Sequence, residues 1–81
     1  MKILHIIRNL NDVTPVEIAI AQSKENEVAI LLMHDAVYSK PQLKTYACSN
    51  DAKARGITAH ECVGYDRIVK MLFEYDKVVS W

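Results

Sequence analysis

Cys48 is the side chain of this sequence best placed to do chemistry. It stands between an expected strand, residues 43–47, and an expected helix, residues 51–55, so its sulfur would lie at a helix amino terminus. The partial positive charge at that end of a helix stabilises a thiolate. Cys48 could therefore act as a nucleophile or carry a transferable sulfur as a persulfide. The alternative is a free cysteine packed as a small hydrophobic residue.

His34 and Asp35 form a second candidate site. They follow directly on the apolar run from Val28 to Met33, so both would emerge at the carboxyl end of one strand. Open α/β sheets bind their ligands at that edge. The alternative is a capping aspartate beside a solvated or interface histidine.

The remaining reactive and aromatic side chains give weaker signals. Cys62 lies in an apolar, alternating stretch and is expected to belong to the core. His5 and His60 are far from His34 in the sequence, so the three histidines predict no metal site. Trp81 is the only tryptophan, and its large ring favours either a subunit contact or packing over the sheet edge. The only glycines are Gly56 and Gly64, so phosphate-binding loops are absent and no cofactor is expected.

The elements that position these residues alternate between strand and helix. Val28 to Met33 is apolar throughout, so this strand must be covered on both faces and is expected at the centre of the sheet. Thr14, Pro15 and Glu17 are typical of a helix start, with Thr14 as the cap, and Gly56 is expected to end a helix in the left-handed conformation. Further strands are expected over residues 3–7, 57–63 and 78–81, and a helical turn over 36–39. Helices are expected over residues 15–23 and after residue 66. The second of these helices has an apolar stripe of Ile68, Val69, Leu72 and Phe73.

This alternation predicts a single α/β domain of three layers over residues 1–81, with a mostly parallel sheet of four to five strands flanked by helices. Lys plus Arg and Asp plus Glu balance at ten each, which argues against binding nucleic acid by bulk charge. No apolar segment approaches the roughly 20 residues of a membrane span, and the first residues lack the features of a signal peptide. We therefore expect a cytoplasmic protein with free thiols.

Four stretches in order along the chain resemble the DsrH/TusB family of sulfur-relay subunits, within the DsrE/DsrF/DsrH group. That family typically shows LL-x-D-G-V-Y, Y-x-L-x-x-D-x-x-A-R-G, D-Y-x-x-F-V and a closing V-x-x-W. The corresponding stretches here are Leu31-Leu32-Met33-His34-Asp35-Ala36-Val37-Tyr38, Tyr46-Ala47-Cys48-Ser49-Asn50-Asp51-Ala52-Lys53-Ala54-Arg55-Gly56, Gly64-Tyr65-Asp66-Arg67-Ile68-Val69 and Val78-Val79-Ser80-Trp81, after an apolar start at Ile3-Leu4-His5-Ile6-Ile7.

The sequence departs from the family at two positions. Ala36 replaces the usual glycine, and Ile20 or its neighbours stand where some DsrH-type subunits carry a cysteine in the first helix. The sulfur-accepting role therefore cannot be carried over to that helix. DsrE-type subunits instead place their cysteine at a strand end shortly before an Arg-Gly pair, and Cys48 precedes Arg55-Gly56 in the same way.

The resemblance implies a cytoplasmic subunit that exchanges persulfide sulfur with donor and acceptor proteins, in 2-thiolation of the tRNA wobble uridine or in sulfur oxidation. It also implies a homodimer or a hetero-oligomer with DsrE- and DsrF-like subunits, without direct contact to nucleic acid. Three functions stay open: a sulfur carrier using Cys48, whether or not it counts as an enzyme; a non-catalytic scaffold docking partners through Trp81 and the Tyr38 region; and a binding module using the crevice at His34, Asp35 and Tyr38.

Overall fold

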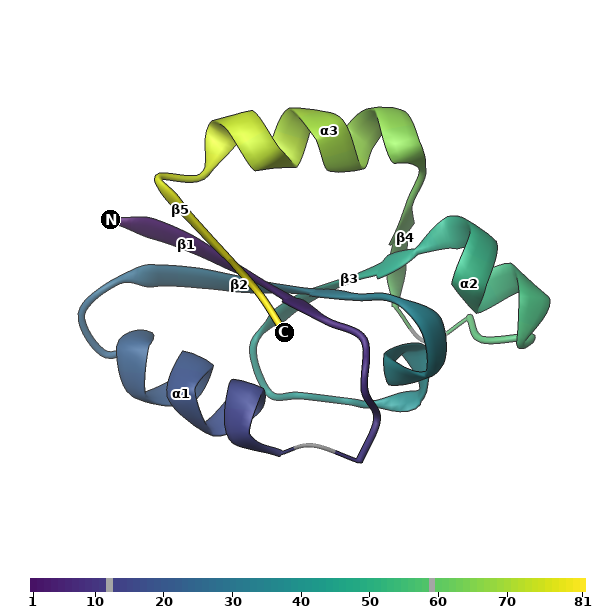
Figure 1. Ribbon diagram of the computed structural model, residues 1–81, viewed down its shortest axis with the longest axis horizontal. Coiled ribbons are helices and arrows are strands. Elements are labelled where there is room, and N and C mark those ends of the chain that lie inside the picture. The colour runs from purple at the N-terminus through teal and green to yellow at the C-terminus, as the bar shows by residue number, and fades with distance from the viewer. Residues whose placement is uncertain (12, 59) are drawn as a thin grey trace.

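A five-stranded sheet forms the centre of the computed structural model, which describes residues 1–11, 13–58 and 60–81. Its strands lie in the order β4-β3-β2-β1-β5 (Figure 1). Every neighbouring pair is parallel, so the sheet is wholly parallel where the sequence predicted a mostly parallel one. The strands are β1 (Lys2–Ile7), β2 (Glu27–Leu32), β3 (Lys44–Cys48), β4 (Glu61–Val63) and β5 (Lys77–Ser80).

The central position of β2 follows from its apolar sequence. Successive side chains of a strand point to opposite faces of the sheet, so an unbroken apolar run needs cover on both. Ile30 and Leu32 pack in the core on one face, whereas Ala29 and Leu31 pack in the core on the other. The prediction of a central buried strand is confirmed.

Helices cover both faces of the sheet, as the predicted three-layer domain requires (Figure 1). The core on one face includes Ala19 of α1 (Thr14–Gln22), Val37 of the 3-10 helix η1 (His34–Tyr38) and Ala52 of α2 (Ser49–Ala54). The core on the other face includes Ile68 and Met71 of α3 (Tyr65–Glu74). Three connections therefore share one face, and within the described residues α3 is the helix that covers the opposite one.

The helix ends differ from the predictions by a few residues. α1 begins at Thr14, so Val13 and not Thr14 occupies the cap position. α2 begins at Ser49, and Cys48 is its cap residue. Gly56 has φ of 66° and ends α2 in the left-handed conformation, as predicted. Asp12 in the predicted loop and Ala59 in the predicted fourth strand lie outside the described residues.

The predicted apolar stripe of α3 is split between core and surface. Ile68 is buried together with Met71, but Val69, Leu72 and Phe73 are exposed. A helix that crosses a sheet buries only a narrow strip, and the i, i+3 pair of Ile68 and Met71 fills it here. The described part of the chain contains no helix long and apolar enough to cross a membrane.

Candidate functional site

The carboxyl edge of the sheet contains a point at which the connections change face. The segments after β1, β2 and β3 turn towards the face of α1, η1 and α2, whereas the segment after β4 leads to α3 on the other face. The connections that leave the neighbouring strands β3 and β4 therefore lead to opposite faces of the sheet. Ligand and active sites of parallel α/β sheets lie at such a switch point. Cys48 is the last residue of β3, so it stands at this point.

Cys48 is nevertheless covered. Only 1% of the residue is exposed, and it packs on the α3 side of the sheet with Leu31, Val63 and Ile68. Asp51, in the first turn of α2, is near enough for the Cys48 thiol to be one of the causes that lower the pKa of its carboxyl. The structure thus places Cys48 at the predicted strand-to-helix junction, as a buried thiol next to a carboxylate.

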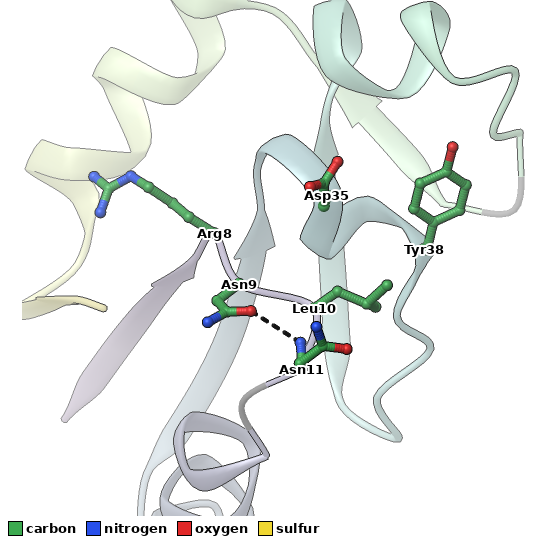
Figure 2. Close-up of a pocket in the computed structure, with 6 residues that line it drawn as sticks. All are labelled: Arg8, Asn9, Leu10, Asn11, Asp35 and Tyr38. Carbon is green, nitrogen blue, oxygen red and sulfur yellow. Dashed lines mark hydrogen bonds between the residues drawn. The ribbon is translucent and has the colours of Figure 1, made fainter.

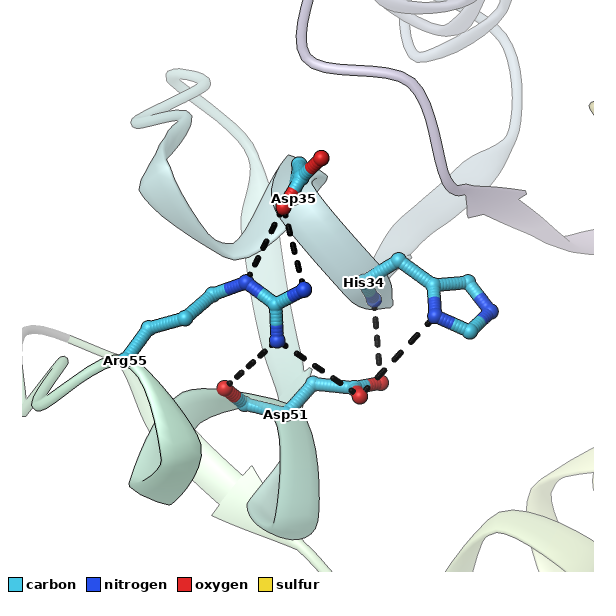
Figure 3. A network of polar contacts seen from close by, with 4 residues as sticks. All are labelled: His34, Asp35, Asp51 and Arg55. Carbon is cyan, nitrogen blue, oxygen red and sulfur yellow. Dashed lines mark hydrogen bonds and ion pairs between the residues drawn. The ribbon is translucent and has the colours of Figure 1, made fainter.

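A polar network ties η1 to α2 beside this thiol (Figure 3). Asp51 Oδ2 accepts a hydrogen bond from the backbone N–H of His34 at 2.9 Å, and its Oδ1 lies 4.0 Å from His34 Nδ1. Arg55 Nη1 lies 3.8 Å from Asp51 Oδ1, and Arg55 Nε and Nη2 donate to Asp35 Oδ1 at 3.1 and 3.0 Å. The sequence singled out His34 and Asp35, but it gave no sign that Asp51 and Arg55 join them.

His34 adopts a strained backbone conformation. Its φ is 51°, the one positive φ of a non-glycine residue in the part of the chain that the structure describes. Such a conformation costs free energy for an L-residue, and histidine is among the residues that adopt it most often. The hydrogen bond to Asp51 holds the His34 N–H in this conformation. The same backbone hydrogen bond lowers the pKa of Asp51, helped by the Cys48 thiol and by the charges of His34 and Arg55, while burial opposes the shift.

A cleft of about 350 Å³ opens at the carboxyl ends of β1 and β2 (Figure 2). Asp35 and Tyr38 line it from η1, whereas His34 turns to Asp51, and the predicted binding role of these three residues stays a prediction. The loop after β1 supplies the rest of its wall: Arg8, Asn9, Leu10 and Asn11. These loop residues were missed, because a polar loop gives no sign of which strand end it faces. The cleft does not include Cys48 among its lining residues.

Trp81 packs back onto its own chain. Its indole Nε1 donates to His5 Nδ1 at 2.9 Å, and the two rings stack with centroids 6.1 Å apart. The other ring nitrogen of the fully buried His5 bonds Gln22 Oε1 of α1 at 2.6 Å. Packing over the sheet edge was one of the two interpretations of this tryptophan. The residue stays 39% exposed, and the predicted subunit contact stays a prediction.

Replacing Trp81 by Phe should destabilise the domain although the aromatic ring is kept. The variant removes the indole donor and leaves the buried Nδ1 of His5 without its hydrogen bond, which typically costs about 1–3 kcal/mol. The free energy of unfolding, measured by urea titration and far-UV circular dichroism, reports the effect. Phe73→Leu, which changes an exposed aromatic residue, is the control and should stay within roughly 0.5 kcal/mol of the parent.

Cys62 is exposed, so its predicted place in the core is wrong. It lies in β4, a three-residue strand at the sheet edge, and next to it Val63 takes the buried position under α3. The Cys62 thiol donates to the His60 carbonyl oxygen at 3.6 Å. Alternation in sequence does not reveal that only one face of so short an edge strand is covered.

The two thiols should therefore differ sharply in reactivity. In native protein, an aromatic disulfide reagent should titrate one thiol rapidly, and this thiol should vanish in Cys62→Ser. The second thiol, Cys48, should react at a comparable rate only after denaturation, because access limits thiol exchange. Two fast thiols in the native parent would contradict the burial of Cys48.

No group of three or more His, Cys, Asp or Glu residues that could hold a metal ion occurs within residues 1–11, 13–58 and 60–81. The site consists instead of a buried thiol, a carboxylate-histidine-arginine network and a neighbouring polar cleft.

Comparisons with known proteins bear on the fold. No protein-family model matches the chain, and no curated protein sequence matches it significantly. Among solved structures, the YchN protein from E. coli superposes with a TM-score of 0.81 at 18% sequence identity, over 99% of this chain and 98% of that chain. The predicted single α/β domain with a parallel sheet flanked by helices is thereby confirmed. At this identity the likeness concerns the fold, and the narrower resemblance to DsrH/TusB stays a prediction.

Proposed function

We propose that this protein is a sulfur-relay subunit, and that Cys48 receives persulfide sulfur from one partner protein and yields it to another. The observation that carries the proposal is the position of Cys48, at the end of β3, directly before α2, where the connections of β3 and β4 change face. In a parallel α/β sheet this is where chemistry is expected. Wobble-uridine 2-thiolation of tRNA and sulfur oxidation are the processes proposed for it, in the cytoplasm.

The transfer step balances without a cofactor. The Cys48 thiol loses its proton, and the thiolate attacks the outer sulfur of the donor persulfide. The sulfur–sulfur bond of the donor breaks, and its cysteine leaves as a thiolate that takes up one proton. The transferred sulfur then sits on Cys48 as a persulfide, and the same exchange with an acceptor cysteine restores the thiol.

Because the Cys48 thiol is buried, the proposed mechanism includes a step that exposes it to the donor. Cys48 is buried under α3, so a donor reaches it only when the packing between α3 and the sheet opens. Burial also protects a resting thiol from oxidation, since exposed thiolates are oxidised first. Partner binding at the carboxyl edge would then control when Cys48 reacts.

Mass spectrometry of the intact chain after incubation with a cysteine desulfurase and cysteine tests the proposal. The parent and Cys62→Ser should gain one sulfur atom, and Cys48→Ser should gain none. Cys62→Ser is the matched control, because Cys62 is the exposed thiol and its removal shows whether the adduct lies on it instead of on Cys48. No adduct on the parent, or an adduct that disappears only in Cys62→Ser, would overturn the role of Cys48.

The burial of Cys48 favours a second candidate, a non-catalytic scaffold that docks DsrE- and DsrF-like partners without carrying sulfur. The exposed Tyr38 at the cleft and the half-exposed Trp81 would then be contact residues. Binding of purified candidate subunits that is unchanged in Cys48→Ser but weakened in Tyr38→Ala, in a chain that gains no sulfur, favours the scaffold.

The cleft favours a third candidate, a module that binds a small polar ligand between Asp35, Tyr38 and the loop after β1. Thermal-shift screening tests it. A ligand whose stabilising effect persists in Cys48→Ser but is lost in Asp35→Ala would support this function, and His34→Ala would show whether the network behind the cleft matters.

A further inference from the structure

His5 is a fully buried histidine with a hydrogen-bond partner at each ring nitrogen. Its Nδ1 accepts from Trp81 Nε1 at 2.9 Å, and its Nε2 lies 2.6 Å from Gln22 Oε1 of α1. An indole N–H can donate but not accept, so His5 Nδ1 carries no hydrogen. The hydrogen of the neutral ring therefore stands on Nε2, from which it donates to Gln22. These two contacts require a neutral His5 in a single tautomer.

The surroundings of His5 offer no partner to a second proton. Its neighbours in the register of the sheet are apolar, Ile30 of β2 and Val79 of β5. The charged residues of the surrounding elements are exposed to solvent: Glu17 of α1, Lys24 and Glu25 after it, Glu27 of β2, Lys77 of β5 and Arg8 after β1. Among the residues that the structure describes, none forms an ion pair with His5. A protonated ring would be a buried charge without a carboxylate, and its Nδ1–H would meet the indole N–H of Trp81.

The segment that holds Trp81 is fastened to β1 and to the loop after it. The backbone N–H of Trp81 donates to the Ile6 carbonyl oxygen at 2.9 Å. Arg8 Nη1 donates to Ser80 Oγ at 2.8 Å and to the Trp81 carbonyl oxygen at 3.0 Å. Arg8 also lines the cleft, and its side chain extends away from the other lining residues (Figure 2). The contacts of Ser80 and Trp81 thus connect the buried His5 ring with the wall of the cleft.

We propose that Ser80 and Trp81 form a latch that neutral His5 holds closed and that a proton on His5 opens. The proton binds Nδ1, so the hydrogen bond from Trp81 breaks and the indole leaves the imidazole ring. Arg8 then loses its two acceptors, so the wall of the cleft changes with the state of His5. Histidine is the side chain that ordinarily changes charge between about pH 5 and 8, so acidification is the trigger. The latch is independent of sulfur transfer by Cys48.

Fluorescence of Trp81, the only tryptophan of the chain, tests the proposal. As the pH is lowered from 8 to 4, the emission maximum should shift to longer wavelength and acrylamide should quench the emission more strongly, because the indole moves into water. The far-UV circular dichroism should stay unchanged over the same range, since the sheet and the helices remain folded. A fluorescence that does not respond, or that changes together with the circular dichroism, overturns the latch.

Two matched variants identify the group that responds to acid. His5→Gln keeps a carbonyl acceptor for Trp81 and an amide donor for Gln22 but takes up no proton in this range, so its fluorescence should stay constant. His34→Gln makes the same replacement at an exposed histidine and should respond like the parent. A response that persists in His5→Gln, or that is lost in His34→Gln alone, contradicts the role of His5.

Hydrogen exchange of the parent tests the latch without any substitution. The amides of Trp81 and Met33 both donate to carbonyl oxygens of β1 at 2.9 Å, the first to Ile6 and the second to Ile7. Between pH 7 and pH 4, the protection factor of the Trp81 amide should fall at least about tenfold, whereas that of the Met33 amide should stay the same, because Met33 is not part of the latch. Equal changes at the two amides, or no change at Trp81, overturn the latch even if the fluorescence responds.

Discussion

Replacing Leu31 by Ala is expected to lower the free energy of unfolding by about 2–5 kcal/mol. Leu31 is fully buried in β2, the central strand, where it packs beneath α3 in the core that also holds Cys48. Deleting its side chain removes buried apolar surface and leaves a cavity that a sheet strand paired on both sides cannot close by moving. A domain of 81 residues has a total stability of only about 4–12 kcal/mol, so the loss is a large share of it.

Urea unfolding followed by circular dichroism measures this loss. Leu10→Ala is the matched control, because Leu10 is 41% exposed in the loop after β1 and its truncation should stay within roughly 0.5 kcal/mol of the parent. Leu31→Ala should also make Cys48 react faster with thiol reagents, since the packing over that thiol loosens. Equal stability of Leu31→Ala and Leu10→Ala would show that β2 is not the element on which both cores rest.

The order of strands and helices could be predicted from the sequence, because the local signals for each element agree with the burial that its side chains need. The apolar run of β2 needs cover on both faces, and the polar turns on either side require helical crossovers between parallel strands. Gly56 marks the end of α2 through its own backbone freedom. Each of these signals comes from residues that are close together in the chain, so a single sequence is enough to recognise it.

The predictions that were wrong concern which side chains are exposed. Exposure depends on contacts between residues that lie far apart in the sequence. Cys62 and the exposed part of α3 have apolar character, but in β4 and α3 the contact between helix and sheet buries only Val63, Ile68 and Met71. Trp81 meets His5 across 76 positions, and Arg55 meets Asp35 across 20. No spacing rule for helix or strand connects such pairs. Of the site residues that the sequence suggested, Cys48, His34 and Asp35 lie at or directly after a strand end, and their roles stay predictions.

The network beside Cys48 should contribute stability that depends on pH through Asp51. The pKa of this carboxyl is held below its ordinary value, chiefly by the hydrogen bond from the His34 N–H and further by the Cys48 thiol and the charges of His34 and Arg55. A carboxyl whose folded pKa is lowered stabilises the fold above its unfolded pKa, about 3.9, and this contribution disappears as the pH falls through the folded pKa. Asp51→Ala is therefore expected to cost about 1–3 kcal/mol at neutral pH, because His34 and Arg55 lose their acceptor.

Asp51→Asn separates the charge from the hydrogen bond. Its amide oxygen can still accept from the His34 N–H, so it should lose less stability than Asp51→Ala at neutral pH, and its deficit relative to the parent should shrink in acid. The free energy of unfolding of both variants at pH 7 and pH 3 gives the two differences. Asp35→Asn is the control, because Asp35 is 70% exposed and its pair with Arg55 is screened by solvent. If the loss of unfolding free energy in Asp51→Asn is the same at both pH values, the Asp51 charge does not hold η1 against α2. The strained conformation of His34 would then be due to packing alone.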